Sequence, residues 1–380
     1  MRILIIPSWY PTPRSPVTGI FVREQANALG QLHDVRVLYV DVLPRGTRRK
    51  SRRRVTRHRS YVEEIVEVPN LPGLWQFAYL WSLFCALRRL RRTFRPDVIH
   101  CHVAVPAGWG VAMLRTLFKL PVVLTEHSGE FVSWTRRFGL RWMARRAFQR
   151  VDTIITVGEV QKRLLKETFP HAAPIRVVSN MVDTARFVPA PFPPTDEEYR
   201  LLFIGLLDTK DKGLHHLLDA LAQVEEKHGI PLHLTVVGDG LLRPDYAIQA
   251  ARLGLGDNVT FVGIQPNSEV ARLLRESHTL VLPSLYESQS VVVIESLASG
   301  RPVIATRCGG PEFLINDENG LVVEPGQAAP LAEAIANLLT HLDRYDPHAI
   351  AADAAKRYGQ DTLVATLTEI YQALQHSHRY

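Results

Sequence analysis

Two carboxylates with a spacing suited to ligand binding, Glu287 and Glu295, lie in the segment PSLYESQSVVVIESLASGRPV, residues 283–303. The pattern predicts a strand, a loop that holds Glu287, a helix that holds Glu295, and a further strand. The residues around Glu295 are apolar, so this helix should be largely buried, and a carboxylate there needs hydrogen-bond donors such as sugar hydroxyls. The helix N-terminus, from Ser288 to Val291, adds free N–H groups and a positive dipole end that suit a diphosphate.

The flanks of these carboxylates carry a resemblance to a known family. A Glu-x7-Glu pair between Pro-Ser and an Ala-x-Gly-x-Pro-Val segment resembles glycosyltransferase family 4. The resemblance implies an α/β fold of the GT-B kind, with two doubly wound Rossmann-like domains facing a central cleft. It also implies a retaining enzyme that uses a nucleotide-diphosphate sugar, in which Glu287 contacts the transferred sugar and Glu295 holds the nucleotide ribose.

A second segment, FIGLLDTKDKG at residues 203–213, resembles the part of the family that holds the donor diphosphate. The resemblance assigns Gly205 to this loop and makes Lys212 the candidate for the neutralising charge. The residue after Gly205 is often Arg in the family and is Leu206 here, so half of the usual phosphate clamp is missing. Lys210 is a candidate to replace it.

Glycine-containing turns follow two further apolar runs. VVGDG, residues 236–240, resembles the turn beside the nucleotide base and contributes Gly238. RCGGPEFLINDENGLVVEPG, residues 307–326, resembles the closing segment of the donor site, in which Gly309 and Gly310 allow the backbone to approach a ligand closely. Glu312, in the same segment, is equally consistent with a mobile loop.

The N-terminal half offers fewer candidates. VTGIFVREQANALG, residues 17–30, resembles the family's glycine-containing loop and first helix, with Gly19 close to the donor phosphates. His127 ends an apolar run where the family places a histidine that faces the sugar. We therefore predict His127, Glu287 and Lys212 as the catalytic residues. His100 and His102 also end a run and should point to one side of the sheet, which makes them weaker candidates for the cleft.

The chain contains no Asp-x-Asp motif, which holds the metal in many GT-A enzymes, so we expect metal-independent transfer with charge neutralised by Lys212 and helix ends. We expect no cofactor besides the nucleotide-sugar co-substrate, a UDP- or GDP-sugar. The three cysteines have no zinc-ligand spacing and are odd in number, which favours a reducing cytoplasm over a disulfide framework.

The elements that must position these residues are short apolar runs alternating with helix-length amphipathic segments, typical of parallel sheets covered on both faces. In the first half the runs are residues 2–7, 34–40, 97–102, 121–127 and 152–157. In the second half they are residues 200–205, 232–238, 258–263, 279–284 and 302–306.

The length of 380 residues favours two domains. We expect an acceptor-side domain at 1–185, a donor-binding domain at 186–361, and a C-terminal helix at about 362–380 that packs back on the first domain. The proline-rich stretch at 188–199 should be the linker or its edge.

Charge is distributed unevenly between the halves. Residues 1–185 hold 30 Lys and Arg against 13 Asp and Glu, whereas the remainder holds 15 against 25. Such an excess favours a polyanionic partner. A polybasic loop at 45–59 next to an aromatic and basic helix at 74–92 resembles a segment that settles on an anionic membrane surface. We therefore expect a lipid-linked or phosphorylated glycan acceptor and a cytoplasmic protein that is peripheral on the inner face of the cell membrane.

Three alternatives remain open on the sequence alone. A GT-B-fold epimerase would convert a nucleotide sugar without any acceptor. A non-catalytic polyanion-binding protein would use the basic half, although no nucleic-acid motif is present and we expect no nucleic-acid partner. A catalytically silent subunit would retain the fold alone, and Leu206 is the one hint of it.

Overall fold

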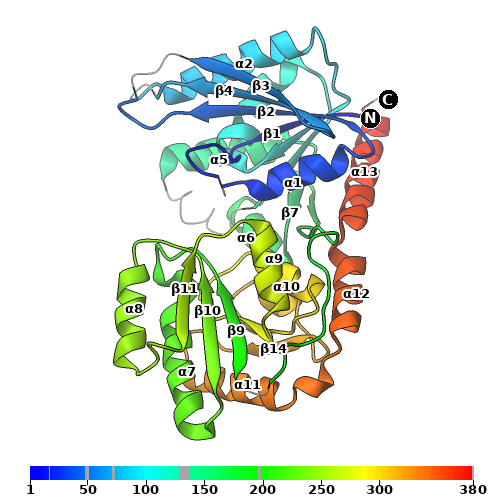
Figure 1. The fold of residues 1–380 in the computed structure, drawn as a ribbon. Coiled ribbons are helices and arrows are strands. Elements are labelled where there is room, and N and C mark those ends of the chain that lie inside the picture. Colours follow the sequence, from blue (N-terminus) through cyan, green and yellow to red (C-terminus); the bar gives the residue numbers. More distant parts are fainter. Residues whose placement is uncertain (17, 48–50, 71–72, 128–136, 196–197, 379–380) are drawn as a thin grey trace. The chain divides into compact units, whose positions relative to one another are not determined.

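The computed structural model describes residues 1–16, 18–47, 51–70, 73–127, 137–195 and 198–378. Within these residues the chain forms two compact units, drawn in Figure 1. The first comprises residues 1–179 together with 363–380, and the second comprises residues 180–362.

The first unit is built on an eight-stranded sheet with the order β3-β4-β2-β1-β5-β6-β7-β8. All neighbouring strands are parallel except β3 and β4. The strands are β1 (Arg2–Pro7), β2 (Asp34–Val42), β3 (Arg52–Arg57), β4 (Tyr61–Val68), β5 (Val98–His102), β6 (Val122–Glu126), β7 (Thr153–Thr156) and β8 (Ile175–Val177). The helices are α1 (Ile20–Leu29), α2 (Trp75–Leu90), α3 (Trp109–Leu114), α5 (Phe138–Arg150), α6 (Glu159–Thr168) and α13 (Gln360–Ser377), with an irregular turn at Ala104–Gly108 and a 3₁₀ turn at Arg115–Leu117.

The second unit is built on a six-stranded parallel sheet with the order β11-β10-β9-β12-β13-β14. The strands are β9 (Tyr199–Ile204), β10 (Leu232–Val237), β11 (Val259–Gly263), β12 (Thr279–Leu282), β13 (Val303–Thr306) and β14 (Gly320–Val323). The helices are α7 (Leu214–His228), α8 (Arg243–Arg252), α9 (Asn267–Arg275), α10 (Val291–Ala298), α11 (Ala328–Thr340) and α12 (Pro347–Tyr358). Short 3₁₀ turns lie at Lys210–Lys212, Pro311–Phe313 and Leu342–Arg344.

Each sheet reverses its strand order at one point, between β1 and β5 in the first unit and between β9 and β12 in the second. In doubly wound sheets a ligand binds at the carboxyl ends of the strands that flank such a reversal. The loops after β9 and β12 carry Lys212 and Glu287, and the loops after β1 and β5 carry Gly19 and the residues that follow His102. The segments predicted from the sequence therefore follow the strands at which doubly wound sheets bind ligands.

The proline-rich stretch is not the linker, and this prediction was wrong. The chain passes between the units at residues 179–180 and again at residues 362–363, and the stretch packs on the second unit instead. The buried guanidinium of Arg301 donates to the Pro191 carbonyl at 2.8 Å and lies over the Phe192 ring at 5.0 Å. The Pro193 carbonyl lies 3.1 Å from Nε2 of His278. Prolines exclude ladder pairing, but their carbonyls remain available as acceptors. Residues 196–197 lie outside the described residues.

The polybasic segment is also not a simple loop. Residues 52–57 form the edge strand β3, which pairs antiparallel with β4. Arg53 donates to Glu64 at 2.9 Å, and Arg54 lies 3.9 Å from Glu63, so two of the predicted surface cations are held by buried carboxylates of β4. Residues 48–50 of the segment lie outside the described residues.

Candidate donor and sugar-facing sites

Lys212 and Glu287, which the sequence places 75 residues apart, are in contact. The Nζ atom of Lys212 donates to Oε1 of Glu287 at 2.6 Å, and the Ser284 hydroxyl donates to the same oxygen at 3.2 Å. The Glu287 side chain is 11% exposed and that of Lys212 is 32% exposed. The structure thus places a lysine and a carboxylate as an ion pair at the switch point of the second sheet.

A close approach between backbone segments creates this contact. Gly213 ends the 3₁₀ turn that carries Lys212, with φ +69°, and a Cβ there would lie 1.9 Å from the Pro283 carbonyl oxygen. Only glycine allows the turn after β9 to rest on the end of β12. Gly205 lies at the start of the same loop. A Cβ at this position would lie 3.3 Å from Cγ of Lys212, so the lysine side chain passes beside Gly205.

Glu295 lies on α10, as predicted, and the helix is largely buried. Glu295 itself is 8% exposed, and Val293, Ile294 and Leu297 beside it are buried. The helix begins at Val291, and no described side chain caps its N-terminus. Ser288 lies in the loop between Glu287 and this helix. The first N–H groups of α10 therefore follow directly on the loop that holds the ion pair, as a diphosphate site requires.

The glycines of the closing segment pack against that loop. Gly310 has no room for a side chain, because a Cβ would lie 2.8 Å from the carbonyl carbon and oxygen of Ser288. The N–H of Gly309 donates to both carboxylate oxygens of Glu312, at 3.0 and 3.1 Å. Glu312 therefore has a structural partner in its own turn, and Gly310 fixes the distance between the closing segment and the α10 loop.

The remaining predicted donor residues occupy different places. Gly238, after β10, lies against the Gly205 carbonyl, to which a Cβ would approach within 1.8 Å. Leu206 is 52% exposed at the position where the family often has Arg. Lys210 lines a pocket of about 370 Å³ formed with residues of α7 and α8. Lys212, in contrast, reaches Glu287, and a role for Lys210 in donor binding stays a prediction.

In the first unit, His127 follows β6 and is held from two sides. Its Nε2 atom lies 2.9 Å from Nδ1 of His102, and its ring lies 4.3 Å from that of Phe21 on α1. Gly19, which precedes α1, rests on the Trp9 backbone with φ +71°. The loop after β1 and the ends of β5 and β6 thus converge on His127.

His100 and His102 are interior residues, and their assignment to a cleft surface was wrong. Both are fully buried, with their rings stacked at 4.3 Å, so the prediction that they share one side of the sheet is confirmed. His100 bonds to the Tyr371 hydroxyl at 2.6 Å and to the Thr125 hydroxyl at 2.7 Å. Burial, with a smaller contribution from His127, lowers the pKa of His100 to about 3. Burial, and then the two neighbouring histidines, lower the pKa of His102 well below its usual value.

The neutral state of His102 decides which nitrogen of His127 carries a hydrogen. Nε2 of His102 is buried and has no hydrogen-bond partner among the described residues. If that atom carried the hydrogen, a buried donor would be unsatisfied, at a cost of roughly 1–3 kcal/mol. The better arrangement has His102 donating from Nδ1 to Nε2 of His127. With Nε2 as the acceptor, a hydrogen on the His127 ring lies on Nδ1.

Sequence reasoning missed three contributors. Ser284 shares the Glu287 oxygen with Lys212, and its place in the Pro-Ser pair was the available signal. Gln289 accepts from the Asn180 N–H at 2.7 Å and ties the α10 loop to the start of the second unit. Tyr371 is 271 residues from His100, and nothing local in the sequence links them.

Comparison with known proteins identifies glycosyltransferase relatives. Residues 18–186 match the model of Glycosyltransferase Family 4, and residues 198–341 match that of Glycosyl transferases group 1. Glycogen synthase of Mycobacterium tuberculosis is 29% identical over 330 residues, which cover 80% of this chain and 77% of that protein.

Solved structures show the same fold. Sucrose-phosphate synthase from Thermosynechococcus elongatus superposes with a TM-score of 0.78 at 22% identity, over 99% of this chain and 100% of the other. Anabaena HepE, solved in complex with UDP, superposes with a TM-score of 0.74 at 19% identity, over 98% and 100%. The two family models together match most of the chain, the two sheets have the doubly wound topology of GT-B enzymes, and the chain belongs to glycosyltransferase family 4.

Proposed function

We propose that this glycosyltransferase moves a hexose-type sugar from a UDP- or GDP-sugar, with retention at the anomeric carbon, to a lipid-linked or phosphorylated glycan of the cell envelope. The observation that carries the donor half of this proposal is the Lys212–Glu287 pair beside the N-terminus of α10. The UDP bound by the Anabaena neighbour supports a uridine nucleotide as the first candidate.

The roles of the residues follow from their chemistry. Lys212 and the first N–H groups of α10 stabilise the negative charge that develops on the departing diphosphate. Glu287 accepts hydrogen bonds from the sugar hydroxyls, and Glu295 accepts them from the ribose. His127 contacts the sugar through its imidazole ring.

In the transfer step the bond between the anomeric carbon and the diphosphate oxygen breaks, and a bond to the acceptor oxygen forms on the same face. The acceptor proton passes to the departing phosphate oxygen, so the step balances without a separate base. Charge neutralisation by Lys212 and α10 makes the reaction independent of a metal in this proposal.

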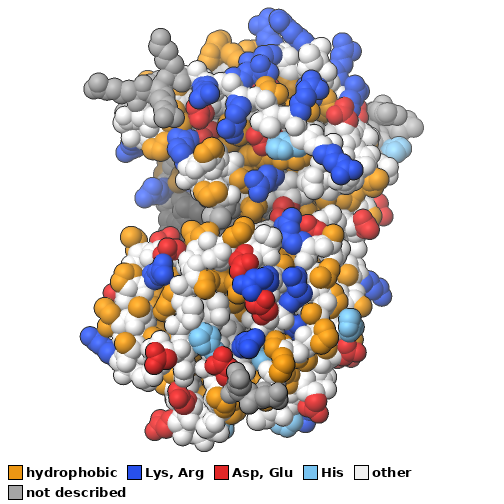
Figure 2. Space-filling view, in the orientation of Figure 1, with side chains coloured by type: hydrophobic (Ala, Val, Ile, Leu, Met, Phe, Trp, Pro, Cys, Tyr) orange, Lys and Arg blue, Asp and Glu red, His pale blue; other side chains and the backbone are white. Residues whose placement is uncertain are grey.

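The surface of the first unit supports an acceptor at an anionic membrane. Leu74, Phe77 and Trp81 form one stripe along α2 and are 53%, 71% and 68% exposed, while the opposite face of the helix is buried. Arg88 continues the stripe and is exposed. In Figure 2, Lys and Arg side chains gather over the first unit. Apolar side chains flanked by cations match the interface of an anionic bilayer. No helix among the described residues is both long enough and apolar enough to span a membrane.

Thermal stabilisation by a panel of UDP-, GDP- and ADP-sugars tests the donor site. A ligand at a hundredfold over its Kd adds about 2.7 kcal/mol to the free energy of unfolding. We expect one nucleotide to stabilise the wild type and the Glu226→Ala control, an exposed site on α7, but not Glu295→Ala. Stabilisation of all three proteins alike would overturn the assignment of Glu295.

Product analysis with the stabilising donor separates the alternatives. Transfer that requires an added glycan acceptor supports the proposal, conversion of the donor without acceptor identifies an epimerase, and binding without either identifies a silent subunit. Retention of the anomeric configuration is read from the NMR spectrum of the product, and unchanged transfer after chelation supports metal independence.

Vesicle co-sedimentation tests the membrane surface. We expect binding to phosphatidylglycerol vesicles, weak binding to phosphatidylcholine vesicles, and a loss of at least fivefold in the double variant Phe77→Ser with Trp81→Ser. Leu32→Ser removes an equally exposed apolar side chain, 73% exposed, elsewhere in the same unit and serves as the control. Equal losses in both proteins would show that the α2 stripe has no special role.

A further inference from the structure

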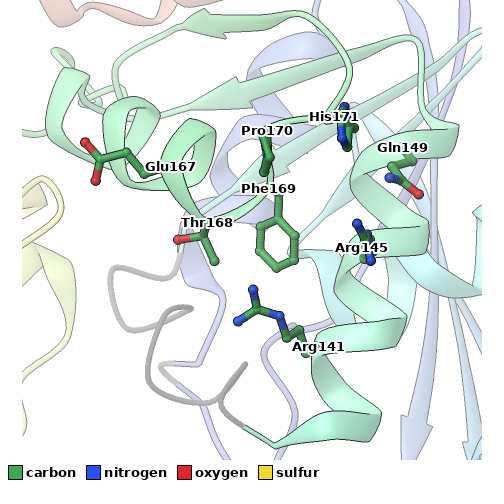
Figure 3. Close-up of a pocket in the computed structure, with 8 residues that line it drawn as sticks. All are labelled: Arg141, Arg145, Gln149, Glu167, Thr168, Phe169, Pro170 and His171. Carbon is green, nitrogen blue, oxygen red and sulfur yellow. The ribbon is translucent and has the colours of Figure 1, made fainter.

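A hollow of about 280 Å³ lies in the first unit between α5 and the end of α6 (Figure 3). Its volume corresponds to roughly nine water molecules, which is enough for a phosphate group and part of what carries it. It is lined by Arg141, Arg145, Gln149, Glu167, Thr168, Phe169, Pro170 and His171.

Among the residues that the structure describes, no carboxylate pairs with the two arginines of this hollow. Arg141 and Arg145 are four residues apart on α5, so their guanidinium groups share one face of the helix. Within the part of the chain that the structure describes, neither side chain forms an ion pair or a hydrogen bond. Glu167 is the one carboxylate among the described residues of the lining, and Figure 3 shows it pointing away from both arginines. Two like charges at this spacing repel, and an anion between them would relieve the repulsion.

If Arg141 and Arg145 had a purely structural role, we would expect their guanidinium groups to donate to the backbone. Cations near a helix C-terminus commonly donate to its last carbonyls. Neither guanidinium does so at the end of α6 among the described residues, where Thr168 instead donates to Leu164 at 2.7 Å. The Arg141 guanidinium is positioned by the buried Phe169 ring, at 5.8 Å from its centre, and therefore keeps its N–H groups available.

We propose that this hollow is a binding site for a phosphate ester, separate from the donor site in the other unit. Paired guanidinium groups bind phosphate oxygens through parallel charge-assisted hydrogen bonds. The Gln149 amide and the His171 ring supply further polar contacts, and Phe169 with Pro170 forms an apolar wall for the carrier of the phosphate. The carrier is either a soluble phosphorylated molecule or a phospholipid headgroup, and the shared chemistry is the phosphate.

The test observes the arginines directly. Glycerol 3-phosphate is titrated into isotopically labelled full-length protein, and the Nε–H signals of Arg141 and Arg145 are followed by NMR after assignment with single variants. We expect both signals to shift with one common Kd. In Arg141→Gln with Arg145→Gln that binding should weaken at least tenfold. The control, Arg146→Gln with Arg150→Gln, removes the same charge from α5 outside the lining and should change it less than twofold.

A second titration identifies the source of the phosphate. The double variant Arg141→Gln with Arg145→Gln is the pocket variant, and Arg146→Gln with Arg150→Gln is the control variant. If glycerol 3-phosphate binding is lost in the pocket variant and kept in the control variant, the ligand is a soluble ester. If binding to phosphatidylglycerol vesicles is lost in the pocket variant and kept in the control variant, the ligand is a phospholipid headgroup. If both variants lose binding of both probes equally, the binding depends only on the general positive charge of α5, and the proposal is overturned. The same holds if neither arginine signal moves. Phosphate taken up at the donor site is common to both double variants and cancels in the comparison.

Discussion

Replacing Glu287 by Gln should have opposite effects on nucleotide binding and on sugar transfer. Without ligand, the Lys212 ammonium is engaged by the Glu287 carboxylate at 2.6 Å. A donor diphosphate must compete with that carboxylate for the lysine. Glutamine keeps the size of the side chain but removes the competing charge, so Lys212 becomes fully available to the phosphates.

The magnitude follows from the exposure of the pair. Exposed ion pairs contribute about 0.2–1 kcal/mol, and removal of one partner from a fully buried pair costs about 3–5 kcal/mol. Glu287 is 11% exposed but Lys212 is 32% exposed, so solvent screening places this pair near the lower limit, at roughly 1 kcal/mol. We therefore expect Glu287→Gln to tighten binding of the free nucleoside diphosphate about fivefold. Turnover should fall on the order of a hundredfold, because the charged contact with the sugar is lost.

Calorimetric titration of the nucleotide and a transfer assay measure the two effects. The matched comparison is the same substitution in a Lys212→Ala background, where the tightening should vanish because no lysine is released. The reasoning is refuted if Glu287→Gln leaves the nucleotide Kd unchanged, or if it tightens binding equally in the Lys212→Ala background.

Three further outcomes are expected. Burial holds the pKa of His100 near 3, below its unfolded value, so the unfolded chain binds one more proton than the folded chain between about pH 6.5 and 3. The free energy of unfolding should therefore fall with decreasing pH, and in His100→Asn that slope should be shallower by about 1.4 kcal/mol per pH unit, measured by urea unfolding. Gly310→Ala should reduce donor affinity at least tenfold in calorimetry with the fold retained, because the added Cβ displaces the α10 loop, whereas Gly256→Ala, which meets open space, should be neutral. Arg301→Leu leaves three carbonyl acceptors without their donor and should lower the free energy of unfolding by about 3 kcal/mol, whereas exposed Arg307→Leu should change it by less than about 0.5 kcal/mol in the same assay.

Much of the sheet architecture could be predicted because it depends on local patterns. Every apolar run named from the sequence overlaps a strand, with ends that differ by no more than two residues, as in residues 2–7 for β1 and 279–284 for β12. The burial of α10 around Glu295 could be predicted for the same reason. The hydrophobic periodicity of a segment predicts whether it is buried, and this prediction does not require knowing which element packs against it.

What could not be predicted depends on partners distant in sequence. The β3 strand was missed because its arginines indicate a solvated loop until the facing glutamates of β4 are known. His100 is buried against Tyr371, and the charge of Lys212 is paired with that of Glu287. Both partners are distant in sequence. Roles in catalysis carried over from the family stay predictions, because contacts between protein side chains do not report contacts with a ligand.

The C-terminal helix α13 has a consequence for the order in which this protein can be completed during synthesis. Residues 363–377 pack in the first unit, where Tyr371 bonds to His100, but the ribosome makes them after all of residues 180–362. At about 5–20 residues per second, the first unit waits on the order of 10–40 s for its last helix. During that time the His100 side of its sheet lacks its cover, and the second unit can fold first. A chaperone can therefore bind the uncovered face of the nascent first unit during this interval.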